Sequence, residues 1–422
     1  MRGALSDRSL VSLIRTDCVC LTGMAQVARA RFTAVGMDMN RQQWLACLAV
    51  APWQLGAWAM DPQKIELGPV NLTPTLEISE RYDDNFRTLD RDEESAWITS
   101  VKPTLLFTRE TRNTGYQFEY SADSQTYLDH ASANHVDHDA NLRGAWAFDA
   151  RNRLDGALTY RRGEDTADTA DDRENDKYTQ QGGRLKYSFG ALSAMNQLEL
   201  GGGYVQQRYR NGGGINDDKE RNTSNVVGTW FHRLGGSTRG LVELSYADYD
   251  YLDAAYRNSK GTRVLVGIDR DVSAKLSGMA RVGYERKDFD SSTSNDYGSG
   301  TWEVGMDYKP REYSVFSVNL RRAFDEGDDG ANTVHVTSSR LGWRHTWSPF
   351  FATDTHVRHA ERDYLGTGGR QDKLNSAGAE LIYTATRWAE VSLGYQRWDN
   401  DSNVASEEYV RNIYLLSVKF TL

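Results

Sequence analysis

Hydrophobic and polar residues alternate over long stretches of this chain, and the pattern is clearest at its end. Every second residue from Tyr414 to Leu422 is apolar, and the residues between them are mostly polar. Side chains alternate between the two faces of a β-strand, so this segment predicts a long strand with one apolar and one polar face. We expect it to close a transmembrane β-barrel by pairing with the first strand, because an unpaired terminal edge would promote aggregation.

Comparable alternating segments recur roughly every twenty positions along the chain. They are longer than the strands of soluble proteins, which average about five or six residues, and this favours a membrane barrel over a soluble β-protein. We predict an all-β fold, a transmembrane antiparallel up-and-down β-barrel of about 18 strands, with 16 possible. The segments are 70–82, 97–108, 116–128, 140–149, 154–162, 178–189, 197–209, 223–234, 240–251, 262–272, 276–289, 300–309, 313–324, 334–347, 351–364, 376–386, 389–398 and 409–422.

The connections between these segments alternate between tight turns and long polar loops. Outer-membrane barrels have short periplasmic turns and longer outer loops, and an even strand number places both termini on the periplasmic side. One expected loop contains His130, His135 and His138, and another is the acidic stretch 163–176. The acidic stretch lacks the spacing of a calcium loop, and we expect both to be solvated loops without a metal.

The polar face of each strand is expected to line the lumen, and the apolar face to contact lipid. Rings of charge can set the selectivity of a wide barrel, although any water-filled lumen needs polar residues. Eighteen strands leave an aqueous channel, whereas the interior of eight would be filled by side chains. The candidate lumen-lining residues are Glu119, Arg143, Lys186, Glu199, Glu243, Arg281, Glu285, Glu303, Asp307, Arg321, Glu380 and Lys419.

Residues 1–59 have the order of a secretory signal peptide. A charged segment after Met39 precedes an apolar stretch that is too short to span a bilayer as a helix. We predict cleavage between Ala59 and Met60, a true translation start at Met37 or Met39, and one barrel domain over 60–422. All three cysteines precede the predicted cleavage site, so the mature barrel would need no disulfide.

Composition narrows the function further. The chain has 11 Trp, 22 Tyr and 13 Phe, which argues against disorder, and its net charge of −9 argues against nucleic acid as a partner. Outer-membrane enzymes need a Ser-His or Asp-His arrangement at the barrel rim, and no such constellation or Gly-x-Ser-x-Gly segment stands out. We therefore expect neither an enzyme nor a cofactor.

The first two predicted strands carry a motif. The run Glu-Arg-Tyr-Asp-Asp-Asn-Phe ends at Phe86, Ala-Trp-Ile follows at Ala96, and Pro74 and Pro103 lie inside the strands. These residues resemble the opening of the second putative β-barrel porin family, whose members occur in exopolysaccharide biosynthesis operons. The resemblance covers about residues 65–422 and implies an outer-membrane component of polysaccharide export without catalytic residues. The prolines are unusual for a closed barrel, and a local bulge at the periplasmic rim could absorb them.

These observations lead to one main functional hypothesis and two alternatives. The main hypothesis is an outer-membrane conduit that exports exopolysaccharide or a similar hydrophilic polymer from a Gram-negative cell. It would work with periplasmic or inner-membrane export machinery, and outer-membrane lipid would surround it. The alternatives are a general diffusion porin for small solutes and a non-conducting surface barrel that acts through its loops as an adhesin or scaffold.

Overall fold

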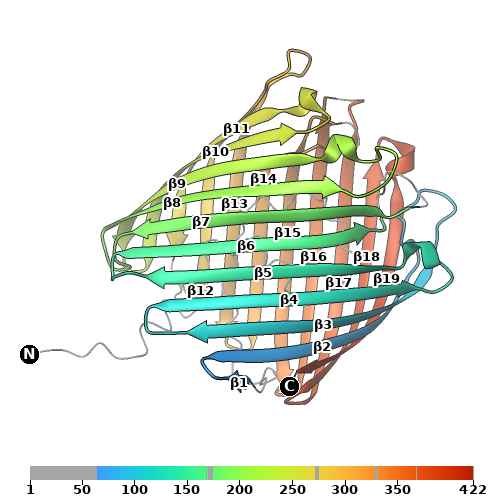
Figure 1. Ribbon diagram of the computed structural model, residues 1–422, viewed down its shortest axis with the longest axis horizontal. Helices are drawn as coiled ribbons and strands as arrows, with labels where there is room; N and C mark the ends of the chain where they lie inside the picture. The colour runs from blue at the N-terminus through green and yellow to red at the C-terminus, as the bar shows by residue number, and fades with distance from the viewer. Residues whose placement is uncertain are drawn as a thin grey trace, which may run out of the picture.

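The structure is a computed structural model that describes residues 64–167, 169, 174–270, 275–327, 331–366 and 368–421. Most of this part of the chain is β-strand (Figure 1). Among these residues, no helix has the length and apolar character needed to cross a membrane. The predicted signal peptide, its cleavage site and the alternative start positions lie outside the described residues and stay predictions.

The strand bounds follow the predicted segments closely. The strands are β1 (Ile65–Leu67), β2 (Val70–Asp83), β3 (Ala96–Glu110), β4 (Thr114–Tyr127), β5 (His135–Ala147), β6 (Asn152–Asp165), β7 (Asp176–Phe189), β8 (Asn196–Tyr209), β9 (Arg221–Gly235), β10 (Thr238–Tyr251), β11 (Ser259–Arg270), β12 (Leu276–Phe289), β13 (Tyr297–Arg311), β14 (Ser314–Glu326), β15 (Thr333–Ser348), β16 (Phe351–Leu365), β17 (Gln371–Thr386), β18 (Ala389–Ser402) and β19 (Tyr409–Thr421). Within the described residues, four short 3-10 helices lie in the loops: η5 (Ala131–Ala133), η6 (Asp217–Lys219), η7 (Ala255–Arg257) and η8 (Ala405–Glu407).

Strand pairing closes the sheet into a barrel of 18 strands. Each strand from β2 to β18 pairs antiparallel with the next one along the chain, and β19 pairs with β2. The pairing of β19 with β2, which we call the seam, is the closure that the sequence predicted. The short β1 pairs with residues 70–72 of β2, on the same edge that β19 occupies along residues 75–83. The predicted fold class and strand number are confirmed.

Tight turns and longer loops occupy opposite ends of the barrel (Figure 1). The turn between β9 and β10 and the turn between β15 and β16 are among the tight ones, whereas residues 84–95 and 210–220 form loops at the other end. The beginning of β2 and the end of β19 lie at the end with the tight turns, which is the periplasmic end in outer-membrane barrels.

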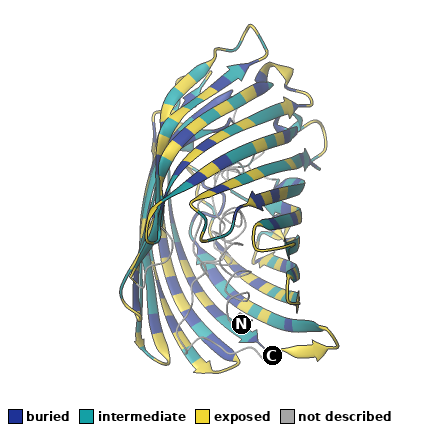
Figure 2. Cartoon of the chain, turned by 90° about the vertical axis from the view of Figure 1, so that its left-hand side faces the viewer, coloured by how far each residue is buried: buried dark blue, intermediate teal, exposed yellow. Residues whose placement is uncertain are grey.

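Buried and exposed residues alternate along the strands (Figure 2). On β10, for example, Val242 and Leu244 are 42% and 57% exposed, whereas Glu243 between them is 7% exposed. Because the sheet is closed, one set of side chains faces the interior and the other faces the surroundings. The exposed set is rich in Leu, Val and Ile, so hydrocarbon is the surrounding that suits it.

Aromatic side chains cluster at two levels of the outer face. Tyr82 and Trp97 lie 5.2 Å apart between ring centroids near the loop end, on strands β2 and β3. Trp388 and Phe420 stack at 6.2 Å beside the tight turn between β17 and β18. Amphipathic rings favour the two membrane–water interfaces, so these levels mark the edges of the lipid-facing band.

Several strands extend further into the predicted loops than the sequence suggested. His135 and His138 belong to β5, and of the three histidines assigned to that loop only His130 remains in it. Likewise β17 begins at Gln371 and β18 continues to Ser402. The predictions stopped where the apolar face ended, but a strand that rises above the lipid carries polar residues on both faces.

The two prolines fit into the barrel without the predicted bulge. Pro74 lies where the edge of β2 changes partner, between Thr75, which pairs with Thr421, and Leu72, which pairs with Ile65. In the ladder between β3 and β4, residue pairing is interrupted at Pro103 and resumes in the same register at Thr104. A proline has no backbone N–H to donate to a neighbouring strand. Each of these two prolines lies at a break in the pairing on one side of its strand, so the missing donor causes no register shift.

The motif residues at the start of the barrel hold the seam together. Asp83 accepts hydrogen bonds from Nε and Nη2 of Arg411 on β19, at 3.0 and 2.6 Å, and both side chains are buried. Asp84 accepts from the backbone and side-chain nitrogens of Asn412 at 2.6 and 2.7 Å. Asn85 donates to the carbonyl of Val410 at 3.2 Å. The motif thus extends the contact between the two chain ends beyond the last paired residues.

Candidate functional site in the barrel interior

The interior wall of the barrel is the candidate functional surface. The twelve residues predicted to line the lumen alternate with outward-facing residues, and none of the twelve is exposed on the outer face. Seven are buried, namely Glu119, Lys186, Glu243, Arg281, Glu303, Arg321 and Glu380. The other five are half-buried, namely Arg143, Glu199, Glu285, Asp307 and Lys419. Whether they act on a solute stays a prediction.

Three of these residues form one compact network together with an arginine that the prediction missed. Arg281 on β12 donates to Glu243 on β10 at 2.6 Å and to Glu303 on β13 at 2.5 Å. Arg263 on β11 donates to Glu303 at 2.8 Å and lies 3.6 Å from Glu243. We call Glu243, Arg263, Arg281 and Glu303 the paired wall. Its two cations and two anions neutralise one another, so it offers little net charge to a passing solute.

Other predicted residues find nearby partners as well. The ammonium of Lys186 lies 3.8 Å from Asp155 and 3.6 Å from Glu199. Arg321 donates two hydrogen bonds to Asp325, at 3.1 and 2.5 Å. The register places Lys419 directly between Glu390 and Glu77 on its neighbouring strands. Over these strands the interior is strongly polar, and charges of opposite sign lie close together.

Strands β15 and β16 show a different pattern. Their inward faces carry Arg340, Arg344, Arg358 and Arg362, which we call the arginine wall. Arg340 lies directly opposite Arg358 in the ladder, and Arg344 lies directly opposite Asp354. Like charges directly opposite one another in a sheet repel, so the contact between Arg340 and Arg358 differs in kind from those of the paired wall.

The sequence prediction missed the arginine wall because the outer face of β16 is weakly apolar. Val357 is 51% exposed on that face, but it is followed there by His359 and Glu361, which are also exposed. Counting every second residue from Val357 and from Leu341 on β15 would have placed Arg358 and Arg340 on the inner face. His356 and His359 lie three residues apart on β16 and point to opposite faces, because His356 is buried and His359 is exposed.

The comparisons with known proteins agree with this architecture. The family described as Putative beta-barrel porin 2 matches residues 59–422. The chain belongs to that family. It is an outer-membrane protein with a porin-like β-barrel. The motif around Asp83, which suggested the family from sequence, is therefore also the motif that fastens the seam of this family member.

Solved structures with similar folds are outer-membrane proteins of low sequence identity. OccK2 (OpdF) of Pseudomonas aeruginosa, solved in complex with glucuronate, has 12% identity and a TM-score of 0.48, over 83% of this chain and 98% of its own. OccAB4 of Acinetobacter baumannii has 12% identity and a TM-score of 0.48, over 85% and 99%. OprD of Pseudomonas aeruginosa has 13% identity and a TM-score of 0.45, over 86% and 97%. Among curated proteins, none matches this chain.

A cluster of buried charges braces the loop end of this porin-family barrel. Arg257 on η7 is fully buried and donates to the Tyr251 hydroxyl and to the backbone carbonyl of Gly327. Glu326 accepts hydrogen bonds from Tyr251 at 2.7 Å and from Lys287. Burial opposes the charge of Arg257, but Tyr251 and Glu326 raise its pKa above the usual value. The cluster ties the connection between β10 and β11 to the end of β14 and to the residue that follows it.

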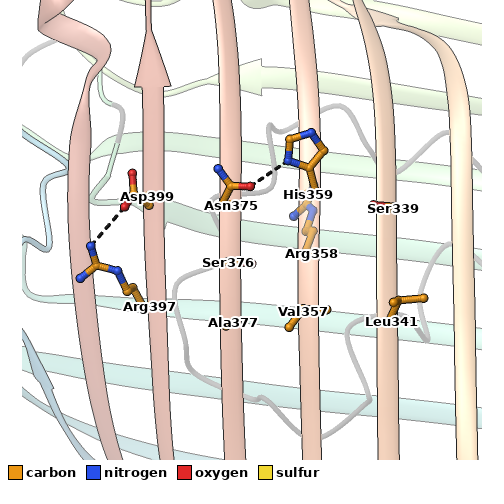
Figure 3. A pocket seen from close by; sticks show the side chains of 10 residues that line it. All are labelled: Ser339, Leu341, Val357, Arg358, His359, Asn375, Ser376, Ala377, Arg397 and Asp399. Carbon is orange, nitrogen blue, oxygen red and sulfur yellow. Dashed lines mark hydrogen bonds and ion pairs between the residues drawn. The ribbon is translucent and has the colours of Figure 1, made fainter.

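One pocket of about 400 Å³ is lined mainly by outward-facing residues of β15 to β18 (Figure 3). Its lower part is formed by Leu341, Val357 and Ala377. Its upper part holds an ion pair of 3.1 Å between Arg397 and Asp399 and a hydrogen bond between His359 and Asn375. The pocket therefore marks the level at which the outer surface changes from apolar to polar.

The described residues contain no group of three or more His, Cys, Asp or Glu side chains placed to hold a metal ion. The chemistry of the interior is that of charged and hydrogen-bonding side chains that face a common space. Such a surface can bind, orient or repel hydrophilic solutes by charge.

Proposed function

We propose that this protein is a passive porin through which small hydrophilic solutes diffuse across the outer membrane. The observation that carries the proposal is the inner wall, where charged and polar side chains follow one another around a closed barrel of 18 strands. A barrel of this strand number is wide enough for an aqueous channel, and its polar lining replaces bulk water as the surroundings of a hydrated solute. Transport would follow the concentration gradient.

Liposome swelling tests this function directly. We expect liposomes that contain the purified barrel to swell in isotonic solutions of small neutral sugars, and the rate to fall as the sugar becomes larger. Liposomes with the heat-denatured protein provide the control. Swelling no faster than in that control would overturn the proposed function and favour the surface barrel that acts through its loops.

Export of exopolysaccharide is the finer function that the family resemblance implied, and it stays a prediction. The contacts of the interior wall favour hydrophilic material in general and do not distinguish a polymer from a small solute. Polysaccharide and periplasmic export machinery would be partners under that function alone. Deletion of the gene followed by an assay of surface polysaccharide separates the two, because loss of the polymer is expected for an exporter and not for a general porin.

A further inference from the structure

Four neutral polar side chains on the inner faces of β17 and β18 form a continuous strip. Ser376 lies on β17, and Gln396, Trp398 and Asn400 are successive inward residues of β18. Ser376 lies directly opposite Trp398 in the ladder between the two strands. All four side chains are buried. We call these four residues the neutral strip.

Each member of the neutral strip has one polar atom without a hydrogen-bond partner among the described residues. These atoms are the hydroxyl oxygen of Ser376, Oε1 of Gln396, Nε1 of Trp398 and Oδ1 of Asn400. The amide nitrogen of Asn400 donates to the carbonyl of Glu407 at 2.6 Å, so its oxygen is the atom left over. Buried polar atoms in proteins are nearly always hydrogen-bonded, and one without a partner costs free energy. Four such atoms on neighbouring positions indicate that their partners come from outside the chain.

Comparable buried groups elsewhere on the inner wall find their partners within the protein. The hydroxyl of Ser392 on β18 lies 2.9 Å from the hydroxyl of Ser417 on β19. Gln197 on β8 accepts a hydrogen bond from Arg239 at 2.7 Å and donates to the carbonyl of Ala191 at 2.6 Å. Burial on this wall therefore does not by itself leave a serine or a glutamine unpaired.

The mixture of donors and acceptors in the neutral strip favours hydroxyl groups as its partners. The amide oxygens of Gln396 and Asn400 require a donor, whereas the indole N–H of Trp398 requires an acceptor. An ionised carboxylate offers only acceptors, and an ammonium group offers only donors. A hydroxyl group can donate and accept, so a solute with several hydroxyls can satisfy every member of the strip.

The spacing of the neutral strip sets the length of a solute that can contact all of it. Successive inward residues of a strand are about 7 Å apart, so Gln396, Trp398 and Asn400 span about 13 Å. A single sugar ring is shorter than this, whereas two or three linked sugars cover it. Next to Trp398, the side chains of Leu374 and Ile413 pack in an apolar cluster and offer no competing hydrogen bond.

We propose that the neutral strip is a binding subsite for small neutral solutes rich in hydroxyl groups, such as a disaccharide or a trisaccharide. This inference rests on the proposed porin function and adds to it a class of preferred solute. The polar atoms of the strip are buried, so a solute reaches them only when neighbouring side chains change rotamer. We therefore expect binding that is weak and rapidly reversible, as passage through a channel requires.

The test is saturation-transfer NMR of maltotriose with the protein purified from outer membranes, in micelles of a detergent without a sugar headgroup. This measurement of binding does not depend on conduction. We expect a saturable signal, and the Kd should rise about fivefold in Trp398→Phe and in Ser376→Ala. Each variant loses one hydrogen bond between neutral groups, and fivefold in Kd corresponds to about 1 kcal/mol. Permethylated maltotriose keeps its acceptors but has no hydroxyl to donate, so it should bind about 25-fold more weakly, fivefold for each amide oxygen.

The matched control is Ser392→Ala, which removes an equally buried hydroxyl from the inner wall. Ser376 and Ser392 are 6% and 5% exposed, but the hydroxyl of Ser392 already has a partner in Ser417. The Kd for maltotriose should therefore stay as in the natural protein. Heat-modifiable mobility on electrophoresis checks that each variant is folded. If Trp398→Phe does not fold, the comparison of Ser376→Ala with Ser392→Ala decides the matter.

The outcomes separate the inference from the function on which it rests. No saturable signal, or an equal Kd in Ser376→Ala and Ser392→Ala, overturns the subsite, because water would then supply the missing partners. Equal binding of maltotriose and its permethylated form also overturns it. In each of these cases, swelling of liposomes that contain the natural protein leaves the porin function intact. Binding that depends on the strip, in a protein whose liposomes do not swell, overturns the porin function and with it the role of the subsite in passage.

Discussion

The paired wall and the arginine wall use the same residue type in opposite ways. In the paired wall, Arg263 and Arg281 each contact Glu303 at hydrogen-bond distance, and the cluster is neutral. In the arginine wall, Arg340 faces Arg358 across the ladder. The first arrangement pairs opposite charges, whereas the second places two like charges directly opposite one another in the ladder. An inward-facing arginine is therefore informative about function only when its cross-strand neighbours are known.

Glu303→Gln should have the largest effect on stability. The side chain is fully buried and accepts hydrogen bonds from two arginines, so the variant leaves two buried cations short of compensation. We expect a loss of about 3–5 kcal/mol, measured as the free energy of unfolding by urea in phospholipid vesicles. Glu361→Gln, on the outer face of β16, is the control and should change stability by less than about 0.5 kcal/mol. If Glu303→Gln and Glu361→Gln changed the free energy of unfolding equally, the buried, paired carboxylate would contribute no more to stability than the exposed one, which would contradict this account.

Asp83→Asn should have the next largest effect, because the seam contains a buried pair of the same kind as the paired wall. The variant loses the charge that holds Arg411, and we expect a loss of about 2–3 kcal/mol. The expected loss is smaller than for Glu303 because one arginine is involved instead of two. The measurement is the same urea unfolding, together with the fraction of protein that assembles in the membrane. Unchanged stability would show that the backbone ladder alone closes the barrel.

Arg340→Gln should behave oppositely to the first two variants. Removing one member of the like-charged pair relieves repulsion, so stability should stay the same or rise by up to about 1 kcal/mol. The matched comparison is Arg281→Gln, in which Glu243 and Glu303 lose a partner and stability should fall. Urea unfolding of both variants provides the measurement. If Arg340→Gln destabilises the barrel as much as Arg281→Gln, the arginine wall is structural in the same sense as the paired wall.

Asp149→Ala should have the smallest effect, since it lies in an exposed turn away from both walls. Asp149 accepts backbone hydrogen bonds from Arg151 and Asn152, at 2.6 and 2.9 Å, and these contacts lower its pKa. A lowered pKa in the folded state means that the carboxylate stabilises the fold above its unfolded pKa, and that this stabilisation is lost as the pH falls through the folded pKa. The stability difference from the natural protein should therefore shrink in acid. A difference that grows in acid would contradict this assignment.

The fold could be predicted from the sequence because a barrel strand in a membrane alternates apolar residues that face lipid with polar residues that face the interior. Alternation, strand length and the rhythm of turns and loops gave the strand number, the closure and the inward set that includes Glu243, Arg281 and Glu303. This alternation is lost above the lipid, where both faces of a strand are polar. His135 and His138 were assigned to a loop for that reason. The prolines were explained only by pairing, since the change of partner beside Pro74 leaves no pattern in the sequence.

The candidate site was predictable as a set of residues but not as an arrangement. Counting every second residue along the strand can place Glu303 on the inner face. The register that brings Arg263 and Arg281 to it depends on how three strands align. The same holds for Arg340 and Arg358, whose opposition across the ladder gives the arginine wall its character. Charge pairing in a barrel is a property of the register, and the register is set by turns whose lengths differ by single residues.

The most direct test of the whole account compares two adjacent positions on β10. In a chain whose Cys18, Cys20 and Cys47 are replaced by serine, Ser245→Cys places a thiol on the inner face and Leu244→Cys places one on the outer face. A membrane-impermeant thiol reagent should modify the protein in liposomes at position 245 and leave position 244 unmodified, because water contacts the first and hydrocarbon the second. Equal modification at both positions, or modification at 244 alone, would contradict a water-filled interior behind a lipid-facing wall.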